Sequence, residues 1–297
     1  MQRKMQSAAS SRRPYCVKSR QTLIESLEPR QLLSTIVVNS PSGATSPPNG
    51  LISLRGAINT ANASTTPTTI TFSSSVFATR QTIGVVGANG LVLTNTSAST
   101  TIIGPAAGVL LDGGGANAVL TVDADVTVSI SNATIQDAGY ADNDDSGGGI
   151  NNGGHLTLRN DAFFGNNAQS VYLAGALINY GTADVANVTF SGNGVDGEQG
   201  AILNSGQMQL VNITAIDNGI VAIGGSLGIG NSIVYGANDA DFFASDPSVA
   251  SSYGHNIIGT INENSSTSPF DATDHVGVDP KLGSLGGQRR PDADFRP

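Results

Sequence analysis

The feature that most constrains this fold is a repeat of three rows between Gly147 and Gly219. Each row opens with a small residue, aliphatic residues and an asparagine, and then passes through a glycine turn into a short strand. The opening steps are Gly149-Ile150-Asn151, Ala176-Leu177-Ile178-Asn179 and Ala201-Ile202-Leu203-Asn204. An asparagine follows each strand, and these asparagines lie 27 and 25 residues apart, at Asn160, Asn187 and Asn212. Such a period is typical of a solenoid.

Strands rather than helices build the rows. Apolar residues alternate within them, as Leu156 and Leu158 do around Thr157. A period of two marks a strand with one buried face, whereas a helical repeat needs about ten or more residues at 3.6 spacing. Glycine and asparagine interrupt the rows too often for that. The sequence therefore predicts an all-β chain that forms a single parallel β-helix.

Parallel rows place equivalent residues on top of one another, so the asparagines after the strands are expected to form a ladder. Asparagine suits the bend because it tolerates left-handed backbone geometry. We expect the ladder amides to be buried and bonded to one another, because an unpaired buried amide costs about 1–3 kcal/mol. Asn132 upstream and Asn231 downstream extend the expected ladder to five coils. A second set lies six residues further along each row, at Asn166, Asn193 and Asn218.

Two short motifs alternate through the rows. Phe163-Phe164-Gly165-Asn166 and Phe190-Ser191-Gly192-Asn193 resemble the F-x-x-N element of the chlamydial polymorphic membrane protein repeat. Gly148-Gly149-Ile150 and Gly200-Ala201-Ile202 resemble its G-G-A-I element. The third row departs from the pattern, because Ala215-Ile216-Asp217-Asn218 lacks the phenylalanine. The resemblance implies a right-handed parallel β-helix on a bacterial surface.

Charge is unevenly distributed along the chain. Residues 1–35 carry seven lysine and arginine residues against two glutamates, whereas the rest carries seven bases against 21 acids. From Ile36 to Asp279 the bases are Arg55, Arg80 and Arg159. An acidic body repels phosphate backbones, so we expect no nucleic-acid partner. No apolar run is long enough to predict a membrane-spanning helix.

The first 35 residues form a basic lead segment that we expect to be disordered. It lacks the apolar core of a secretory signal. Leu27-Glu28-Pro29-Arg30-Gln31-Leu32-Leu33 resembles the LEPR-x-LL motif that begins many large envelope proteins of planctomycete bacteria, where it is thought to act in sorting. The resemblance implies export to the cell envelope or the medium, with the sorting residues Leu27, Glu28, Pro29, Arg30, Leu32 and Leu33. A chance amphipathic helix from Leu23 to Leu33 is the alternative.

The β-helix is expected to span residues 36–285, beginning at Ile36-Val37-Val38. The stretch from Ser53 to Asn62 predicts a short helix, because Leu54, Ile58 and Ala61 share one face and Ser53 is a suitable N-cap. A solenoid needs such a cap, since its end coil exposes core residues and unpaired strand edges. The stretch resembles the S-L-R-x-A-I-x-x-A-N step that opens many bacterial β-helices, where it covers the first coil.

The region beyond the repeat carries a second resemblance. Asn231-Ser232-Ile233-Val234 and the stretch from Gly254 to Gly259 precede Val278-Asp279-Pro280-Lys281-Leu282-Gly283. This order resembles the C-terminal region of surface β-helix proteins with the choice-of-anchor Q domain. The pattern breaks off after Leu285 into a basic stretch with two prolines. We therefore expect residues 286–297 to form an irregular tail.

Parallel β-helices include pectate-lyase-like enzymes, so an active site must be sought. Such lyases need carboxylates that hold Ca²⁺ and a basic proton acceptor, and inverting glycosidases need paired carboxylates. The nearest constellation is Arg159, expected on an outward strand position beside Asp161 and Asp184. The neighbouring rows place Ala186 and Val211 at the arginine's position, so no second base supports it. The acids of the rows are expected singly on solvated turns, at Asp161, Asp184 and Asp217.

A calcium loop is the metal site that the sequence suggests. The stretch from Asp142 to Gly147 begins like D-x-D-x-S-G, but Gly153 stands at the twelfth position, where an EF-hand has a bidentate glutamate. A loose Ca²⁺ site at Asp142, Asp144 and Asp145 and an exposed loop without metal are the two alternatives. The three histidines lack the partner spacing of a zinc site: His155, His255 and His275.

Three asparagines of the expected ladder also match the glycosylation sequon, namely Asn132, Asn187 and Asn212. Their repeat register explains them better as buried ladder residues.

The sequence favours a non-enzymatic secreted or cell-surface β-helix protein that contacts an extracellular glycan or protein through flat strand faces. A degenerate polysaccharide lyase or hydrolase is the alternative, and a fragment of a larger envelope protein is a third hypothesis. A groove with three or more carboxylates around Arg159 would favour the enzyme. A smooth polar face would favour the binding protein.

Overall fold

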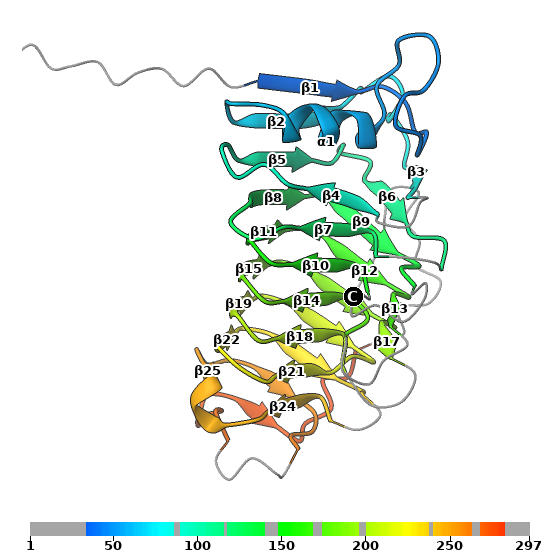
Figure 1. The fold of residues 1–297 in the computed structure, drawn as a ribbon. Coiled ribbons are helices and arrows are strands. Elements are labelled where there is room, and N and C mark those ends of the chain that lie inside the picture. Colours follow the sequence, from blue (N-terminus) through cyan, green and yellow to red (C-terminus); the bar gives the residue numbers. More distant parts are fainter. Residues whose placement is uncertain are drawn as a thin grey trace, which may run out of the picture. The chain divides into compact units, whose positions relative to one another are not determined.

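The computed structural model describes residues 34–85, 90–115, 118–139, 148–168, 174–195, 200–237, 240–262 and 268–282. The chain divides into two compact units, Met1–Gln31 and Leu32–Pro297. All described residues belong to the second unit, a stack of coils built almost entirely of strands (Figure 1). The sorting motif in residues 27–33 and the tail in residues 286–297 lie outside the described residues.

Three sheets form the walls of the stack. Sheet A consists of β1 (Ser34–Val38), β2 (Thr68–Phe72), β5 (Thr100–Ile103), β8 (Thr127–Ser131), β11 (His155–Arg159), β15 (Thr182–Ala186), β19 (Gln207–Val211), β22 (Ser226–Gly230) and β25 (Ala250–Ser252). Sheet B consists of β3 (Gln81–Gly84), β6 (Val109–Asp112), β9 (Ala133–Gln136), β12 (Ala162–Phe164), β16 (Thr189–Ser191), β20 (Thr214–Ile216), β23 (Ile233–Tyr235), β26 (Ile257–Ile258) and β27 (His275–Val276). Sheet C consists of β4 (Leu91–Leu93), β7 (Leu120–Val122), β10 (Ile150–Asn152), β14 (Leu177–Asn179), β18 (Ile202–Asn204), β21 (Ile220–Ala222) and β24 (Phe242–Ala244).

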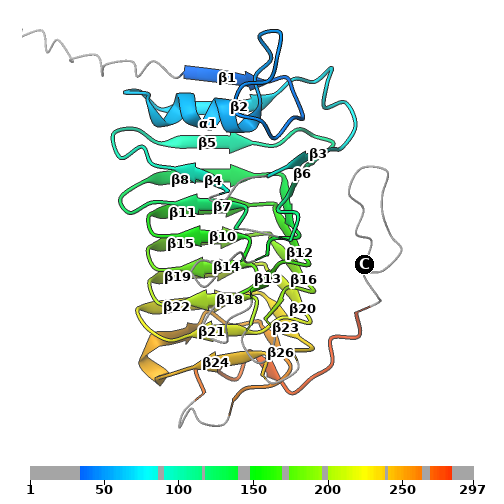
Figure 2. The same ribbon diagram turned by 45° about the vertical axis from the view of Figure 1, so that its right-hand side comes forward.

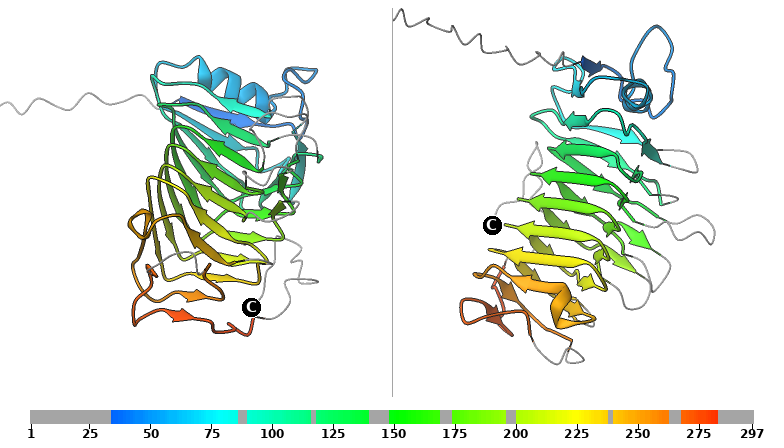
Figure 3. Two further views of the ribbon diagram at one scale, coloured as in Figure 1. Left: turned by 60° about the horizontal axis from the view of Figure 1, so that its bottom comes forward. Right: turned by 60° about the vertical axis from the view of Figure 1, so that its left-hand side comes forward.

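Each regular coil passes through sheet C, then sheet A, then sheet B, as β10, β11 and β12 do. Successive coils lie strand over strand, and the described strands pair in parallel (Figure 3). Two short strands, β13 (Asn167–Ala168) and β17 (Gly194–Val195), pair beside the main sheets, and η1 (Pro247–Val249) precedes β25. The predicted all-β parallel β-helix is confirmed.

The register between coils follows the asparagine spacing of the sequence. Arg159 pairs with Ala186, which pairs with Val211, as the 27- and 25-residue steps require. In sheet C, however, Asn179 pairs with Asn152 rather than with Asn151. The sequence alignment of the first row was therefore wrong by one residue, because two asparagines stand side by side there. The first strand also begins at Ser34, two residues before the predicted start.

The core fills the space between the sheets with the inward residues of each strand. Leu156 and Leu158 are buried, as their alternation with Thr157 predicts. The phenylalanines of the F-x-x-N motif stack in the core, with the rings of Phe163 and Phe190 4.9 Å apart and 15° from parallel. Dispersion and burial along such files bind each coil to its neighbours.

Buried asparagine ladders run along two corners of the core. At the end of the sheet C strands, Asn152 Nδ2 donates to Asn179 Oδ1 at 2.6 Å, and Asn179 Nδ2 donates to Asn204 Oδ1 at 2.7 Å. After the sheet B strands, equivalent bonds of 2.7 and 3.0 Å join Asn166, Asn193 and Asn218. All six side chains are buried: Asn152, Asn166, Asn179, Asn193, Asn204 and Asn218. Each amide therefore pairs with the coils above and below it, which offsets the cost of its burial.

The first coil is covered by α1 (Leu54–Asn62), which begins at the predicted N-cap Ser53 (Figure 2). The Ser53 side chain accepts a hydrogen bond from the Gly56 N–H, and Leu54, Ile58 and Ala61 are buried as predicted. Asn62 completes the free edge of β4: its Nδ2 donates to the Val92 carbonyl at 2.8 Å and its Oδ1 accepts from the Thr94 N–H at 3.0 Å. The helix thus satisfies backbone groups that an open sheet edge leaves unpaired.

The C-terminal end of the stack is closed by residues beyond β24. The Phe270 ring contacts Phe242 edge-to-face, with ring centres 5.0 Å apart. The Asp274 carboxylate accepts hydrogen bonds from Ser252 Oγ at 2.7 Å and from the Asn256 N–H at 2.9 Å. None of the helices in the described ranges is long and apolar enough to cross a membrane.

Candidate functional site

The predicted asparagine ladder lies at the corner between sheets A and B, and we call it the amide corner. Its members all have a left-handed backbone with φ between 52 and 59°, and they are Asn132, Asn160, Asn187, Asn212 and Asn231. Nδ2 of Asn187 donates to Oδ1 of Asn160 at 3.3 Å, and Nδ2 of Asn212 donates to Oδ1 of Asn187 at 3.1 Å. Asn231 continues the ladder to Asn212. The amides from Asn160 to Asn231 bond one another as predicted, whereas no hydrogen bond joins Asn132 to Asn160 in the described structure.

The predicted burial of this ladder is wrong, because all five side chains are exposed. If the strand continued past Leu156 and Leu158, position 160 would point inward with them. The left-handed residue ends that alternation and turns the side chain to the surface. Burial therefore gives no argument against the sequons at Asn132, Asn187 and Asn212.

Asp161 takes the inward position instead and is 3% exposed. Its Oδ1 accepts a hydrogen bond from the Ala133 N–H at 2.8 Å, and its Oδ2 accepts one from the Arg159 N–H at 3.0 Å. Desolvation by burial raises the pKa of Asp161 to about 7, although the two backbone hydrogen bonds lower it. The prediction that Asp161 stands on a solvated turn is therefore wrong.

Other coils use the same inward position to bond the coil before. Ser232 Oγ accepts a hydrogen bond from the Ile213 N–H at 3.2 Å, and Asn256 Oδ1 accepts one from the Ser232 N–H at 3.0 Å. Asp161 bonds Ala133 in the same way. Its first role is therefore to hold two coils together.

A pocket of about 370 Å³ opens at the amide corner, above Asp161. Four successive coils line it, and its polar lining includes Asn132, Asn160, Asn187, Thr134, Thr189 and Asp161. One wall comes from Pro105, Ala106 and Gly108, which precede β6. Among the described residues of the lining, the only ionisable side chain is the buried carboxyl group of Asp161. This arrangement suits hydrogen bonding to a neutral ligand better than acid–base chemistry.

Arg159, the nearest catalytic candidate in the sequence, does not form a constellation with Asp161 and Asp184. Its Nη1 donates to the backbone carbonyls of Leu158 and Asp184, at 3.2 and 3.3 Å. Asp184 is exposed on the surface, whereas the Asp161 carboxylate accepts from the backbone N–H of Arg159. The guanidinium group and the two carboxylates therefore do not converge on one reacting position.

The tentative calcium ligands Asp142, Asp144 and Asp145 lie outside the described residues. Within the described ranges, no group of three or more His, Cys, Asp or Glu side chains is arranged to hold a metal ion.

The outer face of sheet C carries an apolar cluster that was not predicted from the sequence. Three of its members pair in register on neighbouring strands: Ile178, Leu203 and Val221. Ala168 and Ala174 belong to the same cluster, and Phe243 packs against it. Asn151 lies in the same file, pairs with Ile178, is 9% exposed and has no hydrogen-bond partner for its side chain. This face therefore lacks a carboxylate-lined groove in the described coils. The sequence signal for this cluster was the pair of adjacent aliphatic residues that opens a row, such as Leu177-Ile178 and Ile202-Leu203.

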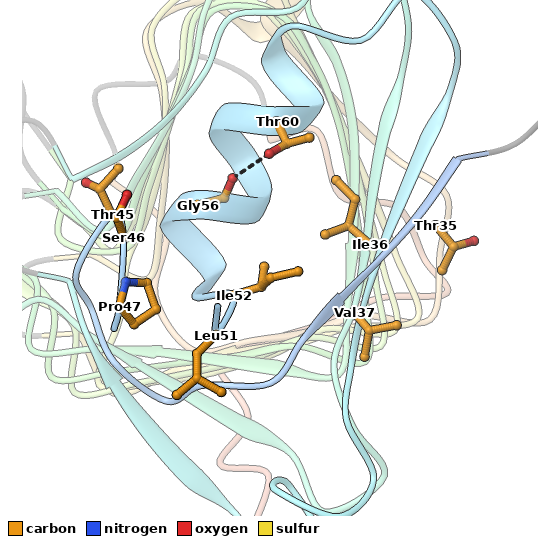
Figure 4. Close-up of a pocket in the computed structure, with 10 residues that line it drawn as sticks. All are labelled: Thr35, Ile36, Val37, Thr45, Ser46, Pro47, Leu51, Ile52, Gly56 and Thr60. Atoms are coloured by element: carbon orange, nitrogen blue, oxygen red, sulfur yellow. Dashed lines mark hydrogen bonds between the residues drawn. The ribbon is translucent and has the colours of Figure 1, made fainter. Parts of the chain in front are cut away.

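A larger pocket of about 480 Å³ lies at the N-terminal end, between β1, α1 and the residues that connect them (Figure 4). Its apolar lining includes Ile36, Val37, Leu51 and Ile52, of which Val37 is 45% exposed. The only side-chain bond drawn there is from Thr60 Oγ1 to the Gly56 carbonyl, at 3.0 Å. The pocket contains no ionisable side chain, so its size does not make it a reaction site.

The raised pKa of Asp161 predicts a loss of stability as pH rises from about 4 to about 7. The folded pKa of about 7 exceeds the ordinary value of 3.8, so the folded state retains a proton that the unfolded chain releases. The contribution of this proton to the free energy of unfolding is fully present below the pKa that Asp161 has in the unfolded chain. It is lost as pH rises through the pKa that Asp161 has in the folded protein. The full change is on the order of 4 kcal/mol, at about 1.4 kcal/mol per pH unit.

Urea unfolding of the wild type and of Asp161→Asn across this pH range checks the prediction. Asparagine keeps an acceptor for the Ala133 N–H but does not titrate, so the difference between the two proteins should change with pH. Asp184→Asn, at an exposed position, is the matched control. A constant difference between wild type and Asp161→Asn would contradict the buried, protonated carboxyl group.

Comparison with known proteins gives no assignment, because no family model and no curated protein matches the chain. The resemblances to surface β-helix families therefore stay predictions from their motifs.

Proposed function

We propose that the chain is a non-enzymatic secreted or cell-surface β-helix protein that contacts an extracellular glycan or protein. The outer face of sheet A is the contact surface in this proposal. The observation that carries it is a file of hydroxyl side chains, one per coil, along five neighbouring strands. This hydroxyl file consists of Thr35, Thr69, Thr101, Ser129 and Thr157.

The hydroxyl file is regular because the strands are in register. Neighbouring strands lie about 4.7–4.9 Å apart, so the hydroxyls repeat at that spacing. The flanking inward residues are buried, as Ile70 and Ile102 are, which fixes the outward direction of Thr69 and Thr101. The hydroxyls of the file make no hydrogen bond within the described structure. They are therefore available to water or to a ligand with many hydroxyl or amide groups.

Charge on this face is low over the same coils. The neighbours of the file on the first four strands are uncharged, such as Thr71 and Ser131. The first acid in the continuing file is Asp184, followed by Gln209. This neutral surface combines hydroxyl groups with the exposed side chains of Val37 and Ile103. It favours contact spread over several coils, and such contact gains affinity through multivalency.

Export and surface attachment are part of this proposal. They are supported by the LEPR-x-LL resemblance in residues 27–33 and by the choice-of-anchor Q resemblance near residues 254–283.

The alternative is a degenerate polysaccharide lyase or hydrolase. Acid–base catalysis needs two positioned titratable groups. Arg159 bonds to backbone carbonyls, and Asp161 is buried beneath the corner pocket. These contacts favour the binding protein over the enzyme.

Binding to immobilised glycans and matrix proteins tests the proposal, with a parallel assay for release of unsaturated oligosaccharides. The double variant Thr101→Glu/Ser129→Glu places two charges in the hydroxyl file and should weaken binding by about tenfold or more. Thr82→Glu, exposed on sheet B, is the matched control. Equal binding by both variants would contradict the sheet A surface. Turnover that Arg159→Ala abolishes would establish the enzyme instead.

A further inference from the structure

The pocket at the amide corner lies where the exposed ladder ends. Gly104 stands at the corner of the preceding coil, where its N–H donates to the Ser131 carbonyl at 2.7 Å. Glycine has no side-chain amide, so it cannot continue the ladder beyond Asn132. Pro105, Ala106 and Gly108 instead form a wall beside the last rungs. The pocket therefore lies where Gly104 replaces the next asparagine of the ladder.

Several polar groups in this pocket have no partner among the described residues. The Asn132 side chain makes no hydrogen bond in the described structure, and Asn160 uses its Oδ1 for Asn187 but leaves its Nδ2 unused. Thr134 is only 7% exposed as a residue, and its hydroxyl has no partner among the described residues. Thr134 lines the pocket, so a water or a ligand there can bond this hydroxyl.

The chemistry of the lining selects the class of ligand. Amides and hydroxyls both donate and accept hydrogen bonds, which matches groups that do the same, such as sugar hydroxyls. An anion would find no cationic side chain among the described lining residues, and the chain carries a net charge of −9. A divalent cation would need several carboxylate ligands, and the lining has one. The volume of about 370 Å³ is at the lower end of the range for small-molecule sites, about 300–1,000 Å³.

We infer that this pocket binds one neutral sugar residue, with Asn132, Asn160 and Thr134 as its hydrogen-bonding groups. The inference rests on the proposed extracellular function only for the source of the sugar, which would be one residue of a surface or matrix glycan. It assigns a discrete subsite at the amide corner, apart from the extended outer face of sheet A. Because single hydrogen bonds to neutral groups contribute modestly, we expect millimolar affinity for a monosaccharide.

Titration of the ¹⁵N-labelled full chain with the methyl glycosides of glucose, galactose, mannose and N-acetylglucosamine tests the site. At least one should give saturable shifts of the Asn132 and Asn160 side-chain amide signals, whereas galacturonate should not. Thr134→Val removes the hydroxyl at nearly constant volume and should weaken binding about fivefold. Asn132→Gly keeps the left-handed backbone and should weaken it at least as much.

Matched controls exist three coils away at the same corner. Thr214→Val lies in the register file of Thr134, and Asn212→Gly is equivalent to Asn132→Gly, yet neither residue lines the pocket. Both should leave the affinity unchanged. Binding that survives Thr134→Val and Asn132→Gly, or no saturable shift with any of the four glycosides, overturns the inference. If either outcome is found while the sheet A face still binds glycans, the sugar site is rejected but the proposed function is not.

Discussion

Replacing Asn193 by alanine is expected to destabilise the folded protein by about 3–5 kcal/mol. Asn193 is 2% exposed, and its amide serves three coils at once. Its Nδ2 donates to the Phe163 carbonyl at 3.0 Å and to Asn218 Oδ1 at 3.0 Å, while its Oδ1 accepts from Asn166 Nδ2 at 2.7 Å. Alanine would remove all three bonds. Asn166 Nδ2 would keep its bond to the Ile135 carbonyl, and Asn218 Oδ1 would keep the bond from the N–H of residue 193. Each buried hydrogen bond lost in this way costs about 1–3 kcal/mol.

Urea unfolding followed by far-ultraviolet circular dichroism measures this effect. Asn187→Gly is the matched control, since Asn187 belongs to the exposed ladder and glycine adopts its φ of 56° without strain. We expect the control to change the free energy of unfolding by less than about 1 kcal/mol. Similar losses at both positions would mean that the buried ladder holds the coils together no more strongly than the exposed one.

The second large effect is expected for Gly206→Ala, which should cost at least about 3 kcal/mol. Gly206 begins the turn before β19, where the coils approach closely. A Cβ atom there would overlap the Gly181 carbonyl oxygen of the preceding coil and lie 2.6 Å from the Tyr180 carbonyl oxygen. Because both obstacles are backbone atoms, they cannot move away without separating two coils.

Gly84→Ala provides the control for this substitution, because a Cβ at Gly84 would meet no atom within 4 Å. Its free energy of unfolding should stay within about 0.5 kcal/mol of wild type. Amide exchange should also rise in β15 and β19 of Gly206→Ala, because the separated coils lose their shared hydrogen bonds. Unchanged exchange and stability in Gly206→Ala would refute the close approach of the turns.

The cap and the strand register were predictable because both rest on local patterns. The Ser53 N-cap and the apolar face of α1 lie within one short stretch, so no distant residue is needed to form them. The 27- and 25-residue spacing fixes which residues pair in sheet A, as Arg159 and Ala186 do. The first row of sheet C was misread at Asn151 because two adjacent asparagines fit the pattern equally well, and only strand pairing selects Asn152.

The candidate site was less predictable because its side-chain directions depend on one corner residue. Alternation from Leu156 and Leu158 points position 160 inward, but the left-handed Asn160 ends the strand and exchanges the roles of positions 160 and 161. Asp161 was therefore expected in water and is buried, and the asparagines were expected in the core and are exposed. The pocket beside them also needs Pro105 and Gly108, which come from another coil.

The sequence by itself determined that this chain stacks in parallel coils, because each row repeats one strand pattern and one turn pattern in a fixed period. Tertiary structure decided which of the asparagines at each coil face the core. That choice depends on where the left-handed corner residue ends each sheet A strand, because this residue interrupts the alternation of inward and outward side chains. The tertiary structure also leaves the side chains of Asn132 and Thr134 without a hydrogen-bond partner among the described residues. Whether such a side chain finds a partner depends on the groups that the neighbouring coil presents to it.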